Sequence, residues 1–95
     1  MVMGTIRKNI AELLEKRRHS ALEISRRVGI KEKEVYQHLP HIEKSAKGRG
    51  KRLNRSPYFC MACGFTFKDR KRFYPPSRCP LCREERISEA VFEIV

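Results

Sequence analysis

The sequence lacks long apolar runs, and it also lacks a recognisable secretion signal. No apolar stretch of the 95-residue chain approaches the roughly 18 residues that a membrane-spanning helix needs, so we expect no segment to cross a membrane. Residues 1–8 show no apolar core followed by a cleavage site. These two absences together favour a cytoplasmic protein.

Groups typical of enzymes are missing as well. No nucleophile–base pair, phosphate-binding glycine loop or metal site with an open position is recognisable. A chain of 95 residues suits one domain, or one small domain with an appendage, and is too short for a multi-domain enzyme with a deep cleft. We therefore expect a protein that is not an enzyme and has no small-molecule substrate.

Acidic residues are few, and positive charge is abundant. The chain carries 22 Lys+Arg against 11 Asp+Glu, a formal net charge of +11. Such an excess indicates a polyanionic partner, most simply nucleic acid, although it can also serve solubility. Residues 44–55 contain six cations and two glycines but no acid, which predicts a flexible, exposed connection.

The first half of the chain has helical periodicity. Four apolar residues spaced by three and four predict a first helix: Ile6, Ile10, Leu13 and Leu14. Thr5 is its predicted N-cap. Ser20 and Glu23 fit a capping box at the start of a second helix, and Gly29 is placed to end it. A third helix should run from Lys31, with Pro40 stopping or kinking it.

Four cysteines occur in two Cys-x2-Cys pairs, and fifteen residues separate the pairs: Cys60, Cys63, Cys79 and Cys82. This spacing is typical of a structural zinc site, because two tight turns brought together complete a tetrahedron of thiolates. Gly64 follows the first pair, where such a turn often needs positive φ, whereas Arg83 occupies the equivalent place after the second pair.

Two disulfides or a redox-active Cys-x-x-Cys pair are the alternatives. Disulfides need an oxidising compartment, and a redox motif is expected as one pair near a βαβ unit rather than as two matched pairs. With four protein ligands no position is open for water, so we expect one structural Zn²⁺, although the same sulfurs can hold a single iron atom. Loss of the metal should unfold at least residues 58–86.

Residues 21–30 and 31–39 have the pattern of a helix-turn-helix, with an ordinary helical hairpin as the alternative. In that motif the second helix enters the major groove. The side chains expected to point toward bases are Lys31, Lys33, Tyr36, Gln37 and His38. Those expected to contact phosphates, or simply to be solvated, are Arg26, Arg27, Lys47, Arg49, Lys51 and Arg52. Glu32 and Glu34 count against strong binding, since carboxylates repel phosphates.

Strand patterns dominate the second half. Residues 53–59 and 86–95 are the candidate strands of a wing, and Ala90, Phe92 and Ile94 share one face. The cysteine segment between them would be inserted at the tip of the wing, with residues 65–73 as a hairpin arm. Cations on this arm would form a second basic patch away from the third helix: Lys68, Arg70, Lys71 and Arg72. We therefore expect three parts: the helix-turn-helix core with the first wing strand at 1–57, the zinc-ribbon insertion at 58–86, and the C-terminal wing strand, packed on the helical core, at 87–95.

The whole chain resembles a family of archaeal proteins described as predicted transcriptional regulators, in which a winged helix-turn-helix is fused to a rubredoxin-like zinc ribbon. Residues 24–39, 60–65, 67–68 and 77–82 carry this resemblance. It implies an α+β fold, a winged helix-turn-helix with a zinc ribbon inserted in the wing. It also implies one zinc ion held by the four cysteines and a DNA-binding role in transcription regulation.

Two other functions stay open at this point. Zinc ribbons also serve as docking surfaces in the transcription and translation machinery, so a protein-interaction adaptor is possible. RNA binding would use aromatic rings that lie among cations, unless those rings form the small core of the ribbon: Tyr58, Phe65, Phe67, Phe73 and Tyr74. Double-stranded DNA remains the first expected partner, with a second copy of the chain as a further one, because one winged helix reads few base pairs.

Overall fold

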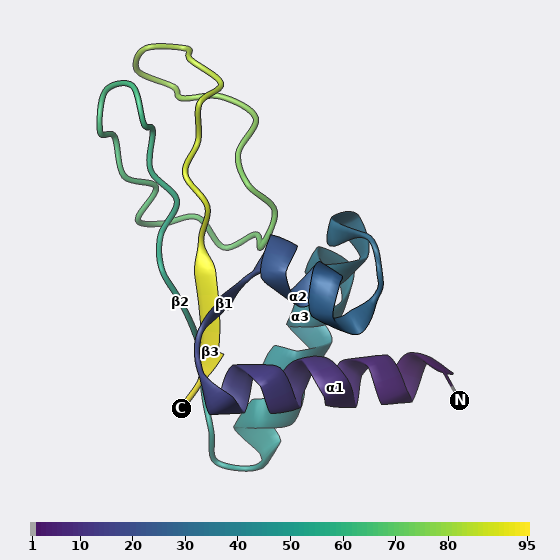
Figure 1. Cartoon of the computed structure of the whole chain (residues 1–95). Coiled ribbons are helices and arrows are strands. Elements are labelled where there is room, and N and C mark those ends of the chain that lie inside the picture. Colours follow the sequence, from purple (N-terminus) through teal and green to yellow (C-terminus); the bar gives the residue numbers. More distant parts are fainter. Residues whose placement is uncertain (1) are drawn as a thin grey trace.

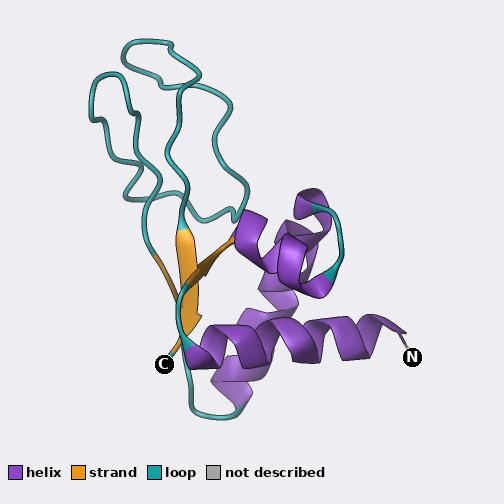
Figure 2. Cartoon of the chain, in the orientation of Figure 1, coloured by secondary structure: helices purple, strands orange, loops and turns teal. Residues whose placement is uncertain are grey.

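Three helices and a small antiparallel sheet form one end of the molecule, and long loops form the other (Figures 1 and 2). The computed structural model describes residues 2–95, with side chains from Thr5 onward. Its elements in chain order are α1 (Val2–Lys16), β1 (His19–Ser20), α2 (Ala21–Val28), α3 (Glu32–Gly48), β2 (Leu53–Arg55) and β3 (Val91–Ile94).

The sheet has the order β1-β3-β2, and both pairings are antiparallel. Phe92 on the central strand faces His19 on one side and Arg55 on the other. Ala90, Phe92 and Ile94 are all buried, which confirms the face predicted from their alternation. The C-terminal strand therefore joins segments that are far apart in the sequence.

The predicted pairing around the cysteine segment is confirmed, but over shorter strands than expected. The ladder between β2 and β3 extends as far as Ser56, whose N–H donates to the carbonyl of Val91. Pro57 follows and has no N–H to donate, which ends the regular ladder. Beyond it only isolated bridges join Phe59 to Thr66 and Cys60 to Ile87.

Local sequence rules hold for α1 and α2 with one exception. Ile10 and Leu14 on the predicted inner face of α1 are buried. The helix begins at Val2, however, so Thr5 lies inside it and the predicted N-cap is wrong. At α2 the Ser20 hydroxyl accepts from the Glu23 N–H at 3.2 Å, and the Glu23 carboxylate accepts from the Ser20 N–H at 2.9 Å.

Helix α3 continues through Pro40 to Gly48, so of the two predicted effects of this proline, a stop or a kink, the stop is wrong. Ile42 and Ala46, beyond the proline, are buried in the same core cluster as Leu39. A proline inside a helix costs about 3 kcal/mol, and burial of an isoleucine and an alanine offsets much of that cost. The predicted connection at 44–55 therefore shrinks to 49–52, because both ends of it lie in α3 and β2.

The hydrophobic core is continuous between the helices and the cysteine segment. Tyr58 and Phe73 belong to the same buried cluster as Phe92 and the helices. The rings of Phe73 and Phe92 lie 6.0 Å apart, and the buried Tyr58 hydroxyl donates to the carbonyl of Phe73 at 2.7 Å. Tyr58 and Phe73 are therefore core residues, as expected, but the core that they join is shared with the helices rather than confined to the ribbon.

The segment expected as a projecting hairpin arm, 65–73, folds back toward the helices. Of its residues, Thr66 alone takes part in a β-bridge, so the segment is a loop rather than a hairpin. Just after it, the ring of Tyr74 lies 5.6 Å from the ring of Tyr36 on α3. Tyr74 therefore ties the end of this basic segment to α3, through a ring contact between residues far apart in the sequence.

Within residues 2–95, none of the helices is both long enough and apolar enough to span a membrane.

Candidate metal centre and nucleic-acid interface

Two loops with the same backbone geometry carry the four cysteines. In the first, the Gly64 N–H donates to the carbonyl of Cys60 and the Cys60 N–H donates to the carbonyl of Phe65, both at 2.8 Å. In the second, the Arg83 N–H and the carbonyl of Glu84 make the equivalent bonds with Cys79, both at 2.9 Å. Each Cys-x2-Cys pair is thus held in the same tight turn, which we call a knuckle.

A left-handed residue closes each knuckle. Gly64 has φ +82°, as its place after the first pair predicts, and Arg83 has φ +64°. Among residues 2–95 Arg83 is the one residue other than glycine with positive φ. The second knuckle manages without glycine by placing an arginine in a backbone conformation that costs about 1–2 kcal/mol for residues with a Cβ.

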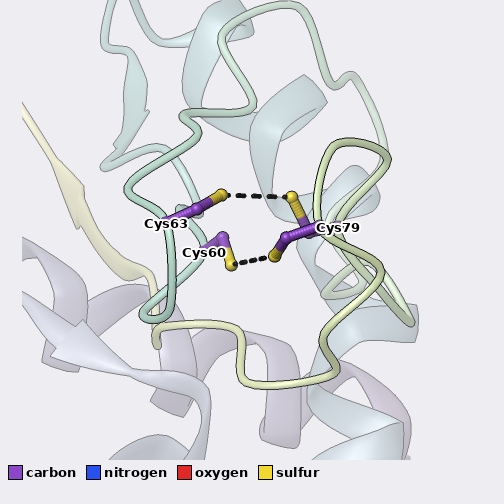
Figure 3. Close-up of side chains that lie close together, drawn as sticks. Cys60, Cys63 and Cys79 are labelled. Carbon is purple, nitrogen blue, oxygen red and sulfur yellow. Dashed lines mark hydrogen bonds between the residues drawn. The ribbon is translucent and has the colours of Figure 1, made fainter.

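The four sulfurs converge on one point between the knuckles. Cys60 Sγ lies 3.5 Å from Cys82 Sγ, and Cys63 Sγ lies 3.6 Å from Cys79 Sγ. All four sulfurs lie within 4.8 Å of one another. A tetrahedral ion with metal–sulfur bonds of about 2.3 Å requires sulfurs ~3.8 Å apart, so the cluster fits a single metal ion. Figure 3 shows Cys60 and Cys63 pointing from one loop toward the sulfurs of the other.

The sulfur–sulfur distances also exclude disulfides in this structure. A disulfide requires about 2.05 Å between sulfurs, and all four cysteines are free. The shortest distances moreover join cysteines of different knuckles, so neither Cys-x2-Cys pair is arranged as an internal redox pair.

Electrostatics within the cluster favour binding of a cation. The backbone N–H of Cys63 is the main cause that lowers the pKa of Cys60 to about 7. For Cys82 the backbone N–H of Glu84 lowers the pKa, but burial and the neighbouring cysteine side chains outweigh it and raise the pKa to about 12. One thiolate therefore opposes the formation of the next, and a divalent cation at the centre removes that repulsion.

The exposed part of α3 is smaller than the sequence indicated. Lys31, Lys33 and Gln37 are exposed, as expected for side chains that would reach a partner. Tyr36 and His38 are buried, with 9% and 4% of their surfaces exposed, so their predicted outward orientation is wrong. Tyr36 packs beneath Tyr74, and His38 Nδ1 accepts from Arg7 Nε at 3.1 Å. Burial lowers the pKa of His38, with a further contribution from Arg7.

The two glutamates at the start of α3 have partners within the chain. The Glu34 carboxylate accepts from the backbone N–H of Lys31 at 3.2 Å and caps the helix. The Glu32 carboxylate accepts from the Tyr36 hydroxyl at 3.3 Å. Burial is the main cause that raises the pKa of Tyr36, and Glu32 adds to it. Both carboxylates therefore form hydrogen bonds with groups of α3 or its N-cap.

The cations expected to contact phosphates lie in two separate places. Arg26 and Arg27 are exposed on α2, close to the start of α3. The others surround the far end of α3, about 25 Å away along a 17-residue helix: Lys47, Arg49, Lys51 and Arg52. Arg49 and Lys51 both reach the Glu15 carboxylate on α1, at 3.3 and 3.1 Å. The two groups of cations therefore lie at opposite ends of α3.

Sequence patterns missed the role of Arg55. Its guanidinium donates to the carbonyls of Arg70 and Arg72 and lies 4.7 Å from the centre of the Phe73 ring. It therefore ties the loop that carries these residues to the end of β2. No local pattern could have revealed this contact, because the partners lie at least 15 residues further along the chain.

Comparisons with known proteins agree with this architecture. The family described as PF0610-like, N-terminal, matches residues 5–54, whereas no curated protein matches the chain. The solution NMR structure of protein PF0610 from the archaeon Pyrococcus furiosus is 36% identical in sequence. The likeness covers 97% of this chain and 90% of that chain, with a TM-score of 0.82. Since the match includes more than half of the sequence, the chain belongs to the PF0610-like family.

Proposed function

We propose that this protein is a DNA-binding transcriptional regulator with a winged helix-turn-helix fold, and that it reads double-stranded DNA with the first half of α3. The observation that carries the proposal is the geometry from α2 to α3. Gly29 ends α2 in the left-handed conformation at φ +81°, and α3 begins at Glu32 with an exposed Lys31 and Lys33 at its start. A short helix, a tight turn and a second helix with exposed N-terminal residues are what the major groove accepts.

The sheet supports the winged form of the motif. β2 and β3 are antiparallel neighbours, as wing strands are, and β1 joins them from the segment between α1 and α2. The knuckles then occupy the tip of the wing, as proposed for the zinc ribbon. The local bonds of Glu32 and Glu34 give both carboxylates a role in α3 itself, although their negative charge still opposes phosphate contact at this end of the helix.

Within the proposed interface the roles follow from side-chain chemistry. Gln37 can pair with adenine in the major groove, and Lys33 with guanine or a phosphate. Arg26 and Arg27 are placed to contact phosphates at the same end of α3. A single helix of this kind reads few base pairs, so the proposal includes a second copy of the chain on an adjacent half-site.

We propose zinc as the metal and a structural role for it. Four sulfurs satisfy a tetrahedral ion fully and leave no position for substrate, and structural sites with four cysteines most often hold zinc. Elemental analysis of the purified protein should find one zinc per chain and a colourless sample. One iron per chain, with absorption in the visible range, would contradict this assignment.

A protein-interaction adaptor is the second candidate, and one observation favours it. Met61 lies in the first knuckle and Leu81 in the second, and they are 57% and 70% exposed. Apolar side chains at the tip of a wing suit a docking contact with another protein. RNA binding through a row of stacking rings has less support, because Tyr58 and Phe73 are buried in the core.

Binding to duplex DNA at two salt concentrations tests the proposal. A preferred duplex is first selected from a random pool with the metal-loaded protein. Lys33→Gln and Lys47→Gln form a matched pair, because both lysines are exposed on α3 at its opposite ends. We expect Lys33→Gln to reduce the preference for the selected duplex over a scrambled one, and Lys47→Gln to leave that preference unchanged.

The regulator proposal fails if the protein binds no duplex at low salt, where the phosphate contribution is greatest. It also fails if the two lysine variants lose the same preference, since α3 would then not be the reading helix. Capture of a component of the transcription machinery that depends on Met61 and Leu81, without any DNA binding, would favour the adaptor.

A further inference from the structure

A pocket of about 270 Å³ lies where the loop after the first knuckle meets the end of β2. Three cationic side chains line it, together with a hydroxyl-bearing residue and two aromatic rings: Arg55, Lys68, Arg70, Ser56, Tyr58 and Phe67. It is separate from the four cysteines and from the exposed residues at the start of α3. Its lining therefore combines aromatic rings with three positive charges.

The positive charge of this pocket is not neutralised by the chain. Among the side chains that the structure describes, none of Arg55, Lys68 and Arg70 forms an ion pair with a carboxylate. Asp69 is the single acid between Lys51 and Arg83, a stretch that contains nine lysines and arginines. Burial lowers the pKa of Arg70, and the nearby charges of Arg72 and Arg55 lower it further. The cations repel one another, and a bound anion would relieve that repulsion.

The two arginines are held in place before any ligand arrives. Arg55 donates to the carbonyls of Arg70 and Arg72 and stacks on the Phe73 ring. Arg70 Nε in turn donates to the carbonyl of Tyr74 at 2.8 Å. Because neutral carbonyls rather than carboxylates hold them, both guanidinium groups are fixed and keep their full charge. A fixed guanidinium loses little conformational entropy when it binds an anion.

We propose that this pocket binds a phosphate group. Cations and N–H donors around a compact pocket suit a tetrahedral oxyanion, and arginine forms bidentate bonds with phosphate. The pocket lies on the loop that reaches α3 through the contact of Tyr74 with Tyr36. On the proposed DNA-binding protein it holds a phosphate of the nucleic-acid backbone, a role that rests on the proposed function. Its affinity for phosphate does not rest on that function.

Titration with inorganic pyrophosphate tests the pocket by itself. We expect saturable shifts of the backbone amide NMR signals of Arg55, Ser56 and Tyr58 and of residues 67–70, and none with sodium chloride at the same ionic strength. Lys68→Gln should weaken this binding several-fold, whereas Lys71→Gln should not. Both lysines are exposed on the same loop, but only Lys68 lines the pocket. Absence of saturable shifts, or equal effects of the two variants, would overturn the proposal.

Titration with duplex DNA identifies the source of the phosphate. Lys68→Gln should reduce the number of counterions released by about one and weaken all sequences alike, relative to Lys71→Gln. DNA binding that both variants leave unchanged would overturn the backbone role of the pocket while the regulator proposal stands. Pyrophosphate binding without any DNA binding would refute the regulator proposal and assign the pocket to a small phosphorylated molecule.

Discussion

At the scale of single residues, the two knuckles differ in one place that matters. Gly64 and Arg83 occupy equivalent positions and share the left-handed conformation, with φ +82° and +64°. Apart from its two chain neighbours, no residue has a heavy atom within 4 Å of the position that a Cβ would take at Gly64, so backbone strain governs a substitution there. The two knuckles therefore allow the backbone strain of a left-handed residue to be compared between a glycine, Gly64, and a residue with a Cβ, Arg83.

Substitutions at these two positions should have opposite effects on stability. Arg83→Gly removes strain of about 1–2 kcal/mol, but glycine has more freedom in the unfolded chain, so we expect a net gain of about 0.5 kcal/mol. Gly64→Ala should cost about 1 kcal/mol for the same reasons. Thermal denaturation of the metal-loaded variants should show a Tm raised by a few degrees for the first and lowered for the second. A lowered Tm for both would show that Arg83 makes a stabilising contact.

Tyr58 carries a second residue-level prediction. Its hydroxyl donates to the carbonyl of Phe73 in the core, whereas the exposed Tyr74 contacts Tyr36 through its ring, at an interplanar angle of 43°. Tyr58→Phe leaves a buried carbonyl unpaired and should cost about 1–3 kcal/mol in the free energy of unfolding. Tyr74→Phe keeps the ring and should change it by less than about 0.5 kcal/mol. Urea denaturation measures both changes in the free energy of unfolding. Equal changes would contradict a stabilising role for the hydrogen bond between Tyr58 and Phe73.

At the scale of elements, α2 depends on its cap. The Ser20 hydroxyl and the Glu23 carboxylate each accept from the other's backbone N–H. Ser20→Ala should cost about 1 kcal/mol, and Ser77→Ala, at an exposed position outside the helices, should cost much less. The bond from the Ser20 N–H is the main cause that lowers the pKa of Glu23 below 4.5.

A carboxylate whose pKa is lower in the folded state stabilises the fold only while it is ionised. The stability contributed by Glu23 is therefore complete above about pH 5 and is lost as the pH falls through 4.5 and then through the lowered folded value. Glu23→Gln should reduce this loss between about pH 5 and pH 3. Unfolding free energies measured across that range test the prediction, and an unchanged pH dependence would contradict it.

The elements also show where sequence patterns suffice. The capping box at Ser20 and the left-handed Gly29 were predictable, because their bonds lie within a few residues. The length of α3 beyond Pro40 could not be predicted, because burial of Ile42 and Ala46 in the core stabilises this part of the helix. Propensity indicates a break at a proline, and only tertiary packing can override it.

At the scale of the molecule, the metal site could be predicted and its surroundings could not. The spacing of the four cysteines identifies the cluster, and their sulfurs do lie together. The attachment of the cysteine segment depends on contacts without local pattern, such as Arg55 with Arg70 and Tyr36 with Tyr74. Both the burial of Tyr36 and the phosphate pocket follow from this attachment. Side-chain exposure on α3 was therefore the part of the site that the sequence predicted least well.

Because the core is continuous, removal of the metal should affect more than the knuckles. Chelation should unfold residues 58–86, and Tyr58 and Phe73 should then leave the core that they share with Phe92. We expect lost near-ultraviolet dichroism of the tyrosines together with a lowered Tm of the remaining helices. Native dichroism after metal analysis has verified complete removal would contradict a structural role for the ion.

The most direct test of the whole account is an NMR titration of the metal-loaded protein with its selected DNA duplex at low salt. The account predicts amide shifts concentrated at residues 31–37, at the start of α3, and at residues 55, 56, 58 and 67–70 around the phosphate pocket. The shifts should weaken together as salt is raised. Absence of shifts at low salt would contradict it. So would shifts confined to the far end of α3, around Lys47 and Arg52, or to the knuckle tips at Met61 and Leu81.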